Sequence, residues 1–136
     1  KFNCKFSTII DLDVTSPLRK ISDIEKALKL FYKKKACNLV SASISRKNPY
    51  FNIVKFDKKS GLGVKTVNKL PYPIFRRQSA PKTYDLNASI YIWRRSHLLI
   101  KKKLLNKDTA LFMMPPERSI DIDDEFDLKI VKNLKK

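Results

Sequence analysis

The alternation of hydrophobic and polar positions predicts a strand, a helix and a second strand between residues 6 and 44. Residues 6–14 (FSTIIDLDV) are apolar and become acidic at their end, which predicts a buried strand. Residues 38–44 (NLVSASI) place Val40, Ala42 and Ile44 on one side of a second strand. A unit of this order and length is a β-α-β unit, which implies a parallel sheet and a right-handed crossover.

The helix between these strands has a start signal and an apolar face. Ser22 is a suitable N-cap, and Glu25 three positions later completes a capping box. Three lysines at 33–35 suit the negative C-terminal end of the helix dipole. Apolar residues recur at helical spacing and form one face: Ile24, Ala27, Leu28 and Phe31.

The remaining sequence predicts a hairpin, followed by a strand, a helix, a strand and a last helix. Residues 50–56 and 64–67 form two short strands around a turn at 58–61. Residues 88–93 and 110–114 predict two further strands, and Ser96 is a candidate cap for a helix over 97–105. The last helix begins near Asp123 or Asp124, and this order of elements indicates an α/β layered fold. Its apolar face comprises Phe126, Ile130, Val131 and Leu134.

Composition limits the class of protein and adds one alternative function. The 136 residues fit one domain, or a large part of one, and 43% hydrophobic residues are enough for a core. No apolar run approaches the ~20 residues that cross a bilayer, so we expect a soluble, cytoplasmic protein. The first residue is Lys1 and the strand pattern starts almost at once, which suggests that a segment is missing upstream.

The charge is strongly positive, with 30 Lys and Arg against 13 Asp and Glu, a net charge of +17. Such a charge attracts polyanions, including nucleic acid. The lysines are scattered in doublets and short runs, which is more typical of solvated helix ends and loops. A basic polyanion-binding module is therefore the alternative function rather than the leading one.

The cysteines and the histidine indicate no catalytic or metal chemistry of their own. Cys4 and Cys37 lie far apart without a CxxC partner, which favours two reduced thiols over a disulfide or a zinc site. His97 is the single histidine and follows two arginines and a serine, where a surface role at a helix start is expected. A Ser/His/Asp triad is therefore not expected.

Two Asp-x-Asp pairs are the clearest candidates for metal binding. Asp11 and Asp13 lie at the carboxyl end of the first strand, where open α/β sheets bind ligands. Asp121 and Asp123 precede the last helix, with the isoleucines between and before them facing the core and both carboxylates facing outward. Mg²⁺ takes one or two carboxylates and completes its shell with water and phosphate oxygens. The alternatives are that Asp123 caps the last helix and that Asp11 is a buried, paired acid.

A second group of polar residues suits an acidic ligand. Arg77 and the arginine before it can fork onto a carboxylate or phosphate. Gln78 and Asn87 offer amides suited to sugar hydroxyls. The alternative is a basic surface loop, with Tyr84 and Tyr91 packed in the core or an interface.

Four short motifs occur in order along residues 11–127. They are DLDVTSPLR at 11–19, NPYFN at 48–52, RQSAPKTYDLNASIY at 77–91, and PERSIDID at 116–123 with Asp127 after it. Together they resemble motifs of the CMP-sialic acid synthetases, or acylneuraminate cytidylyltransferases. The NPYFN motif and the YDLNASIYIWRR stretch are most similar to members that activate legionaminic acid or related bacterial nonulosonates.

The resemblance implies a fold and a reaction. The fold is a Rossmann-like three-layer sandwich of the nucleotide-diphospho-sugar transferase type. A hairpin excursion over about 48–87 serves dimerisation and reaches the partner's sugar site in a homodimer. In the reaction, the anomeric hydroxyl of a nine-carbon 2-keto sugar acid attacks the α-phosphate of CTP. The products are a CMP-sugar and pyrophosphate, and the cofactor is Mg²⁺ or Mn²⁺.

The resemblance also assigns roles to residues. Asp121 and Asp123 become the metal ligands beside the triphosphate, and Asp13 and Tyr91 line the sugar pocket. Arg77 holds the acidic sugar or the opposing phosphate and is counted with the two aspartates as catalytic. The remaining substrate-binding candidates shape or fix the adjoining loops: Thr15, Ser16, Arg19, Gln78 and Asn87.

One family feature has no counterpart here. The family opens with a strand and a glycine- and basic-rich loop that cradles the CTP phosphates, whereas Gly61 and Gly63 both lie in the predicted hairpin turn. The resemblance therefore implies a chain that lacks the N-terminal nucleotide-binding part and is inactive by itself. A degenerate remnant that dimerises without activity is a further alternative.

Overall fold

The computed structural model describes residues 6–56, 63–100 and 103–135, and the chain divides into two units. Unit 1 comprises Lys1–Ser43 and Leu86–Lys136, and unit 2 comprises Ile44–Asp85. Unit 1 contains the main sheet and the α-helices, and unit 2 contains a small hairpin. Among the described residues, no helix has the length and apolar character needed to span a bilayer.

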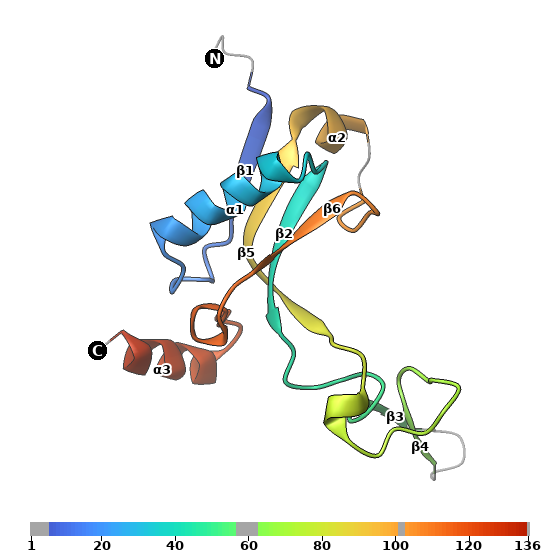
Figure 1. The fold of residues 1–136 in the computed structure, drawn as a ribbon. Helices are drawn as coiled ribbons and strands as arrows, with labels where there is room; N and C mark the ends of the chain where they lie inside the picture. Colours follow the sequence, from blue (N-terminus) through green and yellow to red (C-terminus); the bar gives the residue numbers. More distant parts are fainter. Residues whose placement is uncertain (1–5, 57–62, 101–102, 136) are drawn as a thin grey trace. The chain divides into compact units, whose positions relative to one another are not determined.

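The sheet has four strands in the order β1-β5-β2-β6 (Figure 1). They are β1 (Thr8–Leu12), β5 (Tyr84–Arg94), β2 (Asn38–Ile44) and β6 (Thr109–Met113). β1 is antiparallel to β5, and β2 is parallel to β6. The Arg94 N–H donates to the Cys37 carbonyl at 3.0 Å and the Ile90 N–H donates to Ser41 Oγ at 2.8 Å, so β5 also runs opposite to β2. Three strands therefore share one direction and β5 opposes them.

The prediction of a parallel sheet from the first β-α-β unit is therefore wrong, although the mixed α/β class and the bounds of β2 are confirmed. β5 lies between β1 and β2 and separates the two strands of that unit. Its residues Ile90 and Ile92 are fully buried, as expected for a central strand, whereas β1 is partly exposed at the edge. Periodicity predicts that a segment is a strand, but it gives neither the neighbours nor the direction of that strand.

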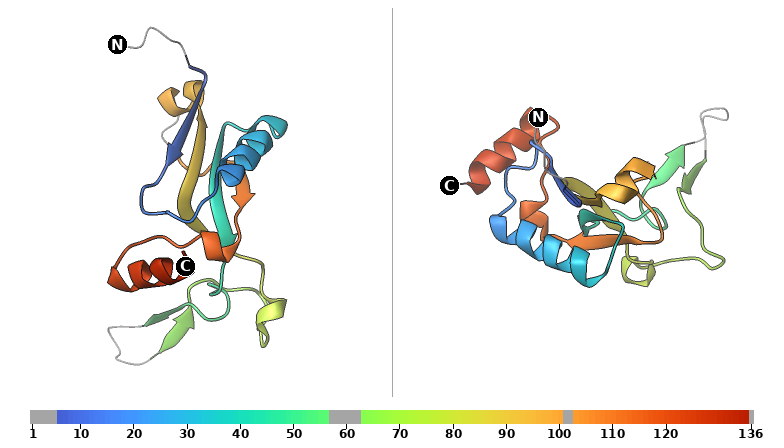
Figure 2. Two further views of the ribbon diagram at one scale, coloured as in Figure 1. Left: turned by 90° about the vertical axis from the view of Figure 1, so that its left-hand side faces the viewer. Right: turned by 90° about the horizontal axis from the view of Figure 1, so that it is seen from above.

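Helix α1 (Ile21–Lys33) crosses one face of the sheet (Figures 1 and 2). Its predicted apolar face is confirmed, because Ala27 and Phe31 are fully buried and the other two members pack against the core. The predicted N-cap, Ser22, is wrong: the cap is Lys20. The Asp23 carboxylate accepts the Lys20 N–H at 2.9 Å, so the helix starts one residue before Ser22.

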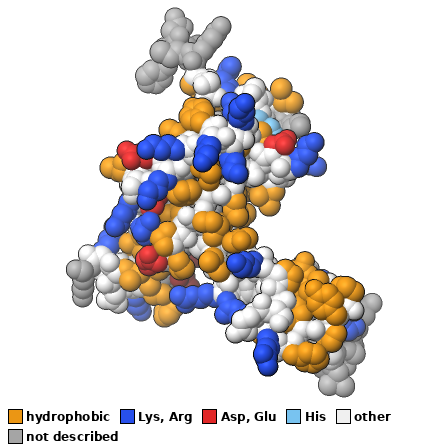
Figure 3. Space-filling model, viewed as in Figure 1, with side chains coloured by type: hydrophobic (Ala, Val, Ile, Leu, Met, Phe, Trp, Pro, Cys, Tyr) orange, Lys and Arg blue, Asp and Glu red, His pale blue; other side chains and the backbone are white. Residues whose placement is uncertain are grey.

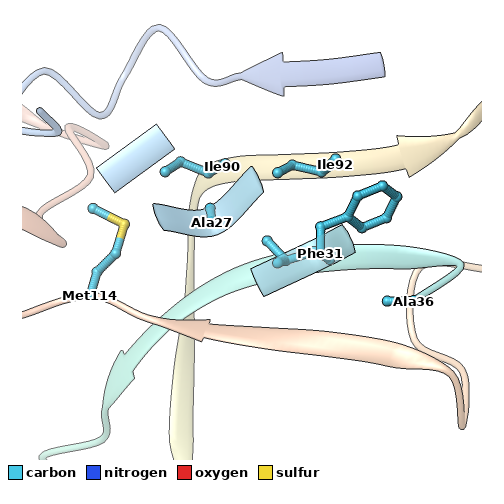
Figure 4. Close-up of a cluster of buried hydrophobic side chains, with 7 residues drawn as sticks. Ala27, Phe31, Ala36, Ile90, Ile92 and Met114 are labelled. Atoms are coloured by element: carbon cyan, nitrogen blue, oxygen red, sulfur yellow. The ribbon is translucent and has the colours of Figure 1, made fainter. Parts of the chain in front are cut away.

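The core of unit 1 lies between α1 and the sheet (Figure 4). Phe31 reaches from the helix toward Ile92, and Met114 closes the end beyond β6. Full burial of a side chain such as Phe31 contributes about 1.5–3 kcal/mol. The buried members of this cluster are Ala27, Phe31, Ala36, Leu39, Ile90, Ile92 and Met114.

The other helices differ from their predictions at their ends. Helix α2 (Arg95–Ile100) includes Ser96, so the prediction that Ser96 caps this helix is wrong. The predicted continuation of the helix over 103–105 is also wrong, because these residues are not helical. Residues 101–102 of that prediction lie outside the described residues. Helix α3 (Glu125–Leu134) starts as predicted. Its N-cap is Asp124, whose Oδ1 accepts the N–H groups of Phe126 and Asp127 at 2.8 and 2.9 Å. Its apolar face is only partly covered, since Val131 is buried while Phe126 and Leu134 are exposed.

Unit 2 contains the predicted hairpin, formed by β3 (Val54–Phe56) and β4 (Val64–Thr66) in antiparallel pairing. The predicted turn at 58–61 lies outside the described residues. The first strand begins later than predicted, because residues 48–53 turn around Asn48. The Asn48 carbonyl accepts the N–H groups of the three residues 51–53, and Asn48 Oδ1 accepts the Tyr50 N–H at 2.9 Å. Two short 3₁₀ helices complete the elements, η1 (Arg77–Ser79) in unit 2 and η2 (Pro116–Arg118) in unit 1.

Candidate functional site

The loop after β1 presents an ionised carboxylate. Asp13 Oδ1 accepts the Thr15 N–H at 3.0 Å and the Thr15 hydroxyl at 2.8 Å. These two hydrogen bonds, helped by the charge of Arg19, hold the pKa of Asp13 below its usual value. Asp13 is therefore charged at neutral pH, and Thr15 fixes the direction of one of its oxygens.

Two more predicted site residues attach this loop to β5. Ser16 is fully buried and its hydroxyl donates to the Asn87 carbonyl at 3.3 Å. Arg19 donates from Nη1 to the Ser89 carbonyl at 2.8 Å. The structure therefore places Ser16 and Arg19 in the support of the loop, with these hydrogen bonds made to backbone groups of β5.

Asn87 is the centre of a buried polar network. Its Oδ1 accepts the Ser41 hydroxyl at 2.6 Å, and its Nδ2 donates to Ser119 Oγ at 2.9 Å. Asn87 is 5% exposed, and the next residue, Ala88, has the left-handed φ of 51°. The amide joins β5 to β2 and to the segment after η2, so it has a positioning role and little access to a ligand. Ser41 and Ser119 are not among the predicted site residues, because single serines distant in sequence carry no local signal.

The segment Ser119–Asp123 lies beside the loop after β1. The Ile122 N–H donates to the Thr15 carbonyl at 3.0 Å, which joins the two directly. Asp123 is exposed, as expected, and its N–H donates to Asp127 Oδ2 at 3.2 Å. Asp123 does not cap α3, because Asp124 does.

Asp121 differs from the expectation that both carboxylates face outward. Its Oδ1 is buried and has no hydrogen-bond donor among the residues that the structure describes. A buried carboxylate oxygen without a donor costs free energy, which a bound cation offsets. The Asp121 carboxylate therefore fits a hard metal ion.

Tyr91 connects the two acidic pairs. Burial raises the pKa of its phenol, and the charges of Asp13, Asp11 and Asp121 add to this effect. Asp11 is the register partner of Tyr91 across β1 and β5. Three of the four acids, Asp11, Asp13 and Asp121, thus act on one partly buried phenol.

A metal at Asp121 would take few ligands from the protein. Within residues 6–56, 63–100 and 103–135, no three or more His, Cys, Asp or Glu side chains are grouped so as to hold a metal ion. Mg²⁺ sites with one or two carboxylates are completed by water and by phosphate oxygens of the substrate.

Arg77 and Gln78 belong to unit 2, whereas the other predicted site residues belong to unit 1. Both residues lie in η1 and are exposed. Arg77 donates from Nη2 to the Ser45 carbonyl at 3.1 Å, which fixes its side chain within unit 2. Their exposure leaves guanidinium and amide groups free to contact an anion.

Comparison with known proteins gives relatives over nearly the whole chain, although no model of a protein family matches it. Post-translational flagellin modification protein B of Campylobacter coli is 42% identical over 133 residues, which are 98% of this chain and 54% of the relative. CMP-N,N'-diacetyllegionaminic acid synthase of Campylobacter jejuni subsp. jejuni is 44% identical over 133 residues, with the same two shares of 98% and 54%. N-acylneuraminate cytidylyltransferase of Streptococcus agalactiae is 30% identical over 116 residues, 85% of this chain and 27% of the relative.

These similarities agree with the family that the four motifs indicate. The chain spans about half the length of the two Campylobacter relatives that it matches. Two of the three relatives are named for the synthesis of CMP-sugar acids or for cytidylyl transfer. Over the residues that align, the chain belongs to the CMP-sialic acid synthetase family.

Proposed function

We propose that this chain forms the metal- and sugar-binding side of a cytidylyltransferase. The reaction joins a nonulosonic, sialic-type acid to CMP from CTP and releases pyrophosphate. The names of the relatives support this reaction at the level of the family. The observation that carries the proposal is the buried Oδ1 of Asp121, which has no donor among the described residues and lies on a segment bonded to the Asp13 loop.

Asp121 and Asp123 are the proposed ligands of Mg²⁺ or Mn²⁺. When bound, such an ion withdraws charge from the triphosphate and so assists displacement at the α-phosphate. Asp121 contributes an oxygen for which the described residues supply no donor, and Asp123 contributes an exposed carboxylate two positions later. The clustering of acidic charge around Tyr91 favours a divalent cation over a monovalent one.

The sugar acid is proposed to lie beside the loop after β1. Asp13 is ionised and accepts hydrogen bonds from sugar hydroxyls, while Tyr91 provides an apolar ring with a polar tip. Arg77 and Gln78 are proposed to hold the carboxylate of the sugar or a phosphate, because both side chains are exposed. Supporting roles fall to residues already bonded within the protein: Thr15, Ser16, Arg19 and Asn87.

A homodimer formed through unit 2 is also proposed. Figure 3 shows hydrophobic side chains gathered over this unit, at the lower right. Val54, Phe56 and Val64 on the hairpin are each more than half exposed, at 52%, 57% and 62%. A second copy would remove this apolar surface from water. Analytical ultracentrifugation should show that the native chain is a dimer and that Phe56→Lys is a monomer. Lys55→Gln, on the opposite face of the hairpin, is the control and should remain a dimer. A monomeric native chain would reject the proposal.

The cation site is tested by Mn²⁺ binding to the chain, measured by electron paramagnetic resonance. Asp121→Asn and Asp123→Asn should each weaken binding by about 100-fold, because each removes a charged ligand. Asp108→Asn is the matched control, since Asp108 is an exposed acid beside the opposite end of β6. Equal affinity in all four proteins would reject the metal assignment.

The reaction is tested in a chimera in which this chain replaces the aligned part of the Campylobacter jejuni relative. Pyrophosphate release from CTP should depend on the sugar acid and on the metal. Asp121→Asn in the chimera should lower turnover about 100-fold. Release that persists without a sugar acid would contradict the proposed reaction.

A further inference from the structure

The segment that carries Asp121 and Asp123 is preceded by a buried ion pair that the sequence analysis did not consider. Arg118 donates from Nε to Asp23 Oδ2 at 2.9 Å and from Nη2 to Asp23 Oδ1 at 2.8 Å. The Asp23 side chain is 2% exposed and that of Arg118 is 24% exposed. The pair is therefore a bidentate one, with the carboxylate almost fully removed from water.

This pair connects two elements that are distant in sequence. Asp23 lies in the first turn of α1, where its Oδ2 also accepts the Lys20 N–H at 2.9 Å. Arg118 ends η2, directly before Ser119. One carboxylate thus caps α1 and holds the residue from which the segment 119–123 starts.

Two further hydrogen bonds attach the same segment on its other sides. Ser119 accepts from the buried amide of Asn87, and the Ile122 N–H donates to the Thr15 carbonyl. Together with the Arg118 pair, these contacts join the segment to α1, to β5 and to the loop after β1. Asp121 lies between the second and third of these attachments.

The pair is better explained by geometry than by stability. A buried ion pair repays its desolvation cost poorly, and apolar residues of similar size often stabilise a protein as well. Its specific property is the planar fork of the guanidinium, which accepts a carboxylate in a single orientation. Such a contact fixes the direction in which the chain leaves η2.

We propose that Asp23 and Arg118 are positioning residues that hold the carboxylates of Asp121 and Asp123 in the geometry that binds the metal. This inference rests on the proposed function of Asp121 and Asp123. Neither Asp23 nor Arg118 touches the metal, because their polar atoms are bonded to each other. Breaking the pair therefore weakens metal binding through the freedom it gives to residues 119–123.

The test uses Asp23→Asn and Arg118→Lys in the full chain. Arg118→Lys keeps the charge and one hydrogen bond but loses the fork, so it provides a folded variant if Asp23→Asn unfolds the chain. Glu25→Gln and Glu117→Gln are the matched controls. Glu25 is exposed near Asp23 in α1, and Glu117 is exposed in η2, where its carboxylate lies 4.0 Å from Arg118 Nη1, so Glu117→Gln removes this outer contact and keeps the fork to Asp23.

Two readouts separate positioning from a merely structural role. Amide hydrogen exchange at residues 119–123 should accelerate about 10-fold in both variants and in neither control, while the amides of β2 and β5 keep their rates. The Mn²⁺ dissociation constant should rise about 10-fold in the same two variants, as is typical when the support of a metal ligand is removed. Asp23→Glu keeps a carboxylate opposite Arg118 and should therefore bind Mn²⁺ more tightly than Asp23→Asn does.

The outcomes distinguish this inference from the proposed function. Wild-type Mn²⁺ affinity in Arg118→Lys and Asp23→Asn would overturn the positioning role, even if exchange at residues 119–123 accelerates. Unchanged exchange in both variants would also overturn it. Failure of the native chain to bind Mn²⁺ would overturn the metal assignment itself, and the inference with it.

Discussion

Unit 1 and unit 2 are held together by different interactions. Every buried apolar side chain that the structure describes belongs to unit 1, where α1 covers the sheet. In the described part of unit 2 the buried side chains are those of Ser45 and Asn48, both polar. Its apolar residues are largely exposed instead, with Phe75 at 84% and Ile44 at 64%.

The difference shows where each unit obtains its stability. Apolar burial stabilises unit 1 by itself, since it is the dominant favourable contribution to folding. The described part of unit 2 has hydrogen bonds around Asn48 instead, and its apolar side chains are largely exposed. The proposed metal ligands lie in unit 1, which has the apolar core, while Arg77 and Gln78 lie in unit 2.

The largest expected effect compares one phenylalanine from each unit. Phe31→Ala should lower the free energy of unfolding by about 3–5 kcal/mol, because Phe31 is fully buried and its loss leaves a cavity. Phe75→Ala should change it by less than about 0.5 kcal/mol when the chain is monomeric, because Phe75 is 84% exposed. Urea unfolding followed by circular dichroism measures both. Equal losses would show that unit 2 has a core of its own.

An intermediate effect tests the hydrogen bonds of unit 2. Asn48→Ala should cost about 1–3 kcal/mol locally, because the Tyr50 N–H loses its acceptor and the Pro81 carbonyl loses a donor at 2.7 Å. Hydrogen exchange should accelerate at residues 50–53 while β2 and β5 of unit 1 stay protected. Asn68→Ala is the control, as Asn68 is exposed and is bonded through its backbone. Uniform acceleration in both units would contradict their separation.

The smallest effect concerns the end of α1 in unit 1. Lys35 has a φ of 50°, the left-handed conformation that glycine adopts at little cost. Lys35→Gly should therefore raise the free energy of unfolding by about 1 kcal/mol. Lys34→Gly, one residue earlier with a φ of −82°, should instead leave stability unchanged or lower it. A thermal melt in which both variants lose stability would exclude strain at Lys35.

Local patterns predicted much of unit 1. The apolar face of α1 was predictable because helical spacing alone selects Ala27 and Phe31, and β2 was found with its observed bounds. The N-cap was not, because Lys20 is a poor cap by sequence and takes this position only because the Asp23 carboxylate accepts its N–H. Asp23 is itself held by Arg118, a partner 95 residues away that no local pattern indicates.

In the candidate site, too, local patterns predicted some residues and not others. The Asp-x-Asp spacing and the family motifs selected Asp13 and Asp121, which the structure places at the same end of the sheet. The supports of these residues were not predictable. Ser41 and Asn87 meet across 46 residues, and their contact depends on β5 lying beside β2, which no local pattern reports.

Ala88 has a further consequence for how β5 tolerates changes in length. Burial along this strand falls on Asn87 and Ser89, and then on Ile90 and Ile92, so the alternation of its two faces changes phase just after the left-handed residue. A strand with strict alternation has no such change of phase. Ala88 stands between Asn87 and Ser89, so deleting it would make these two residues neighbours and turn their side chains to opposite faces of the strand. Loss of one residue here would therefore cost the hydrogen bonds of the Asn87 amide while Ile90 and Ile92 keep their spacing, whereas most single-residue deletions in surface loops are tolerated.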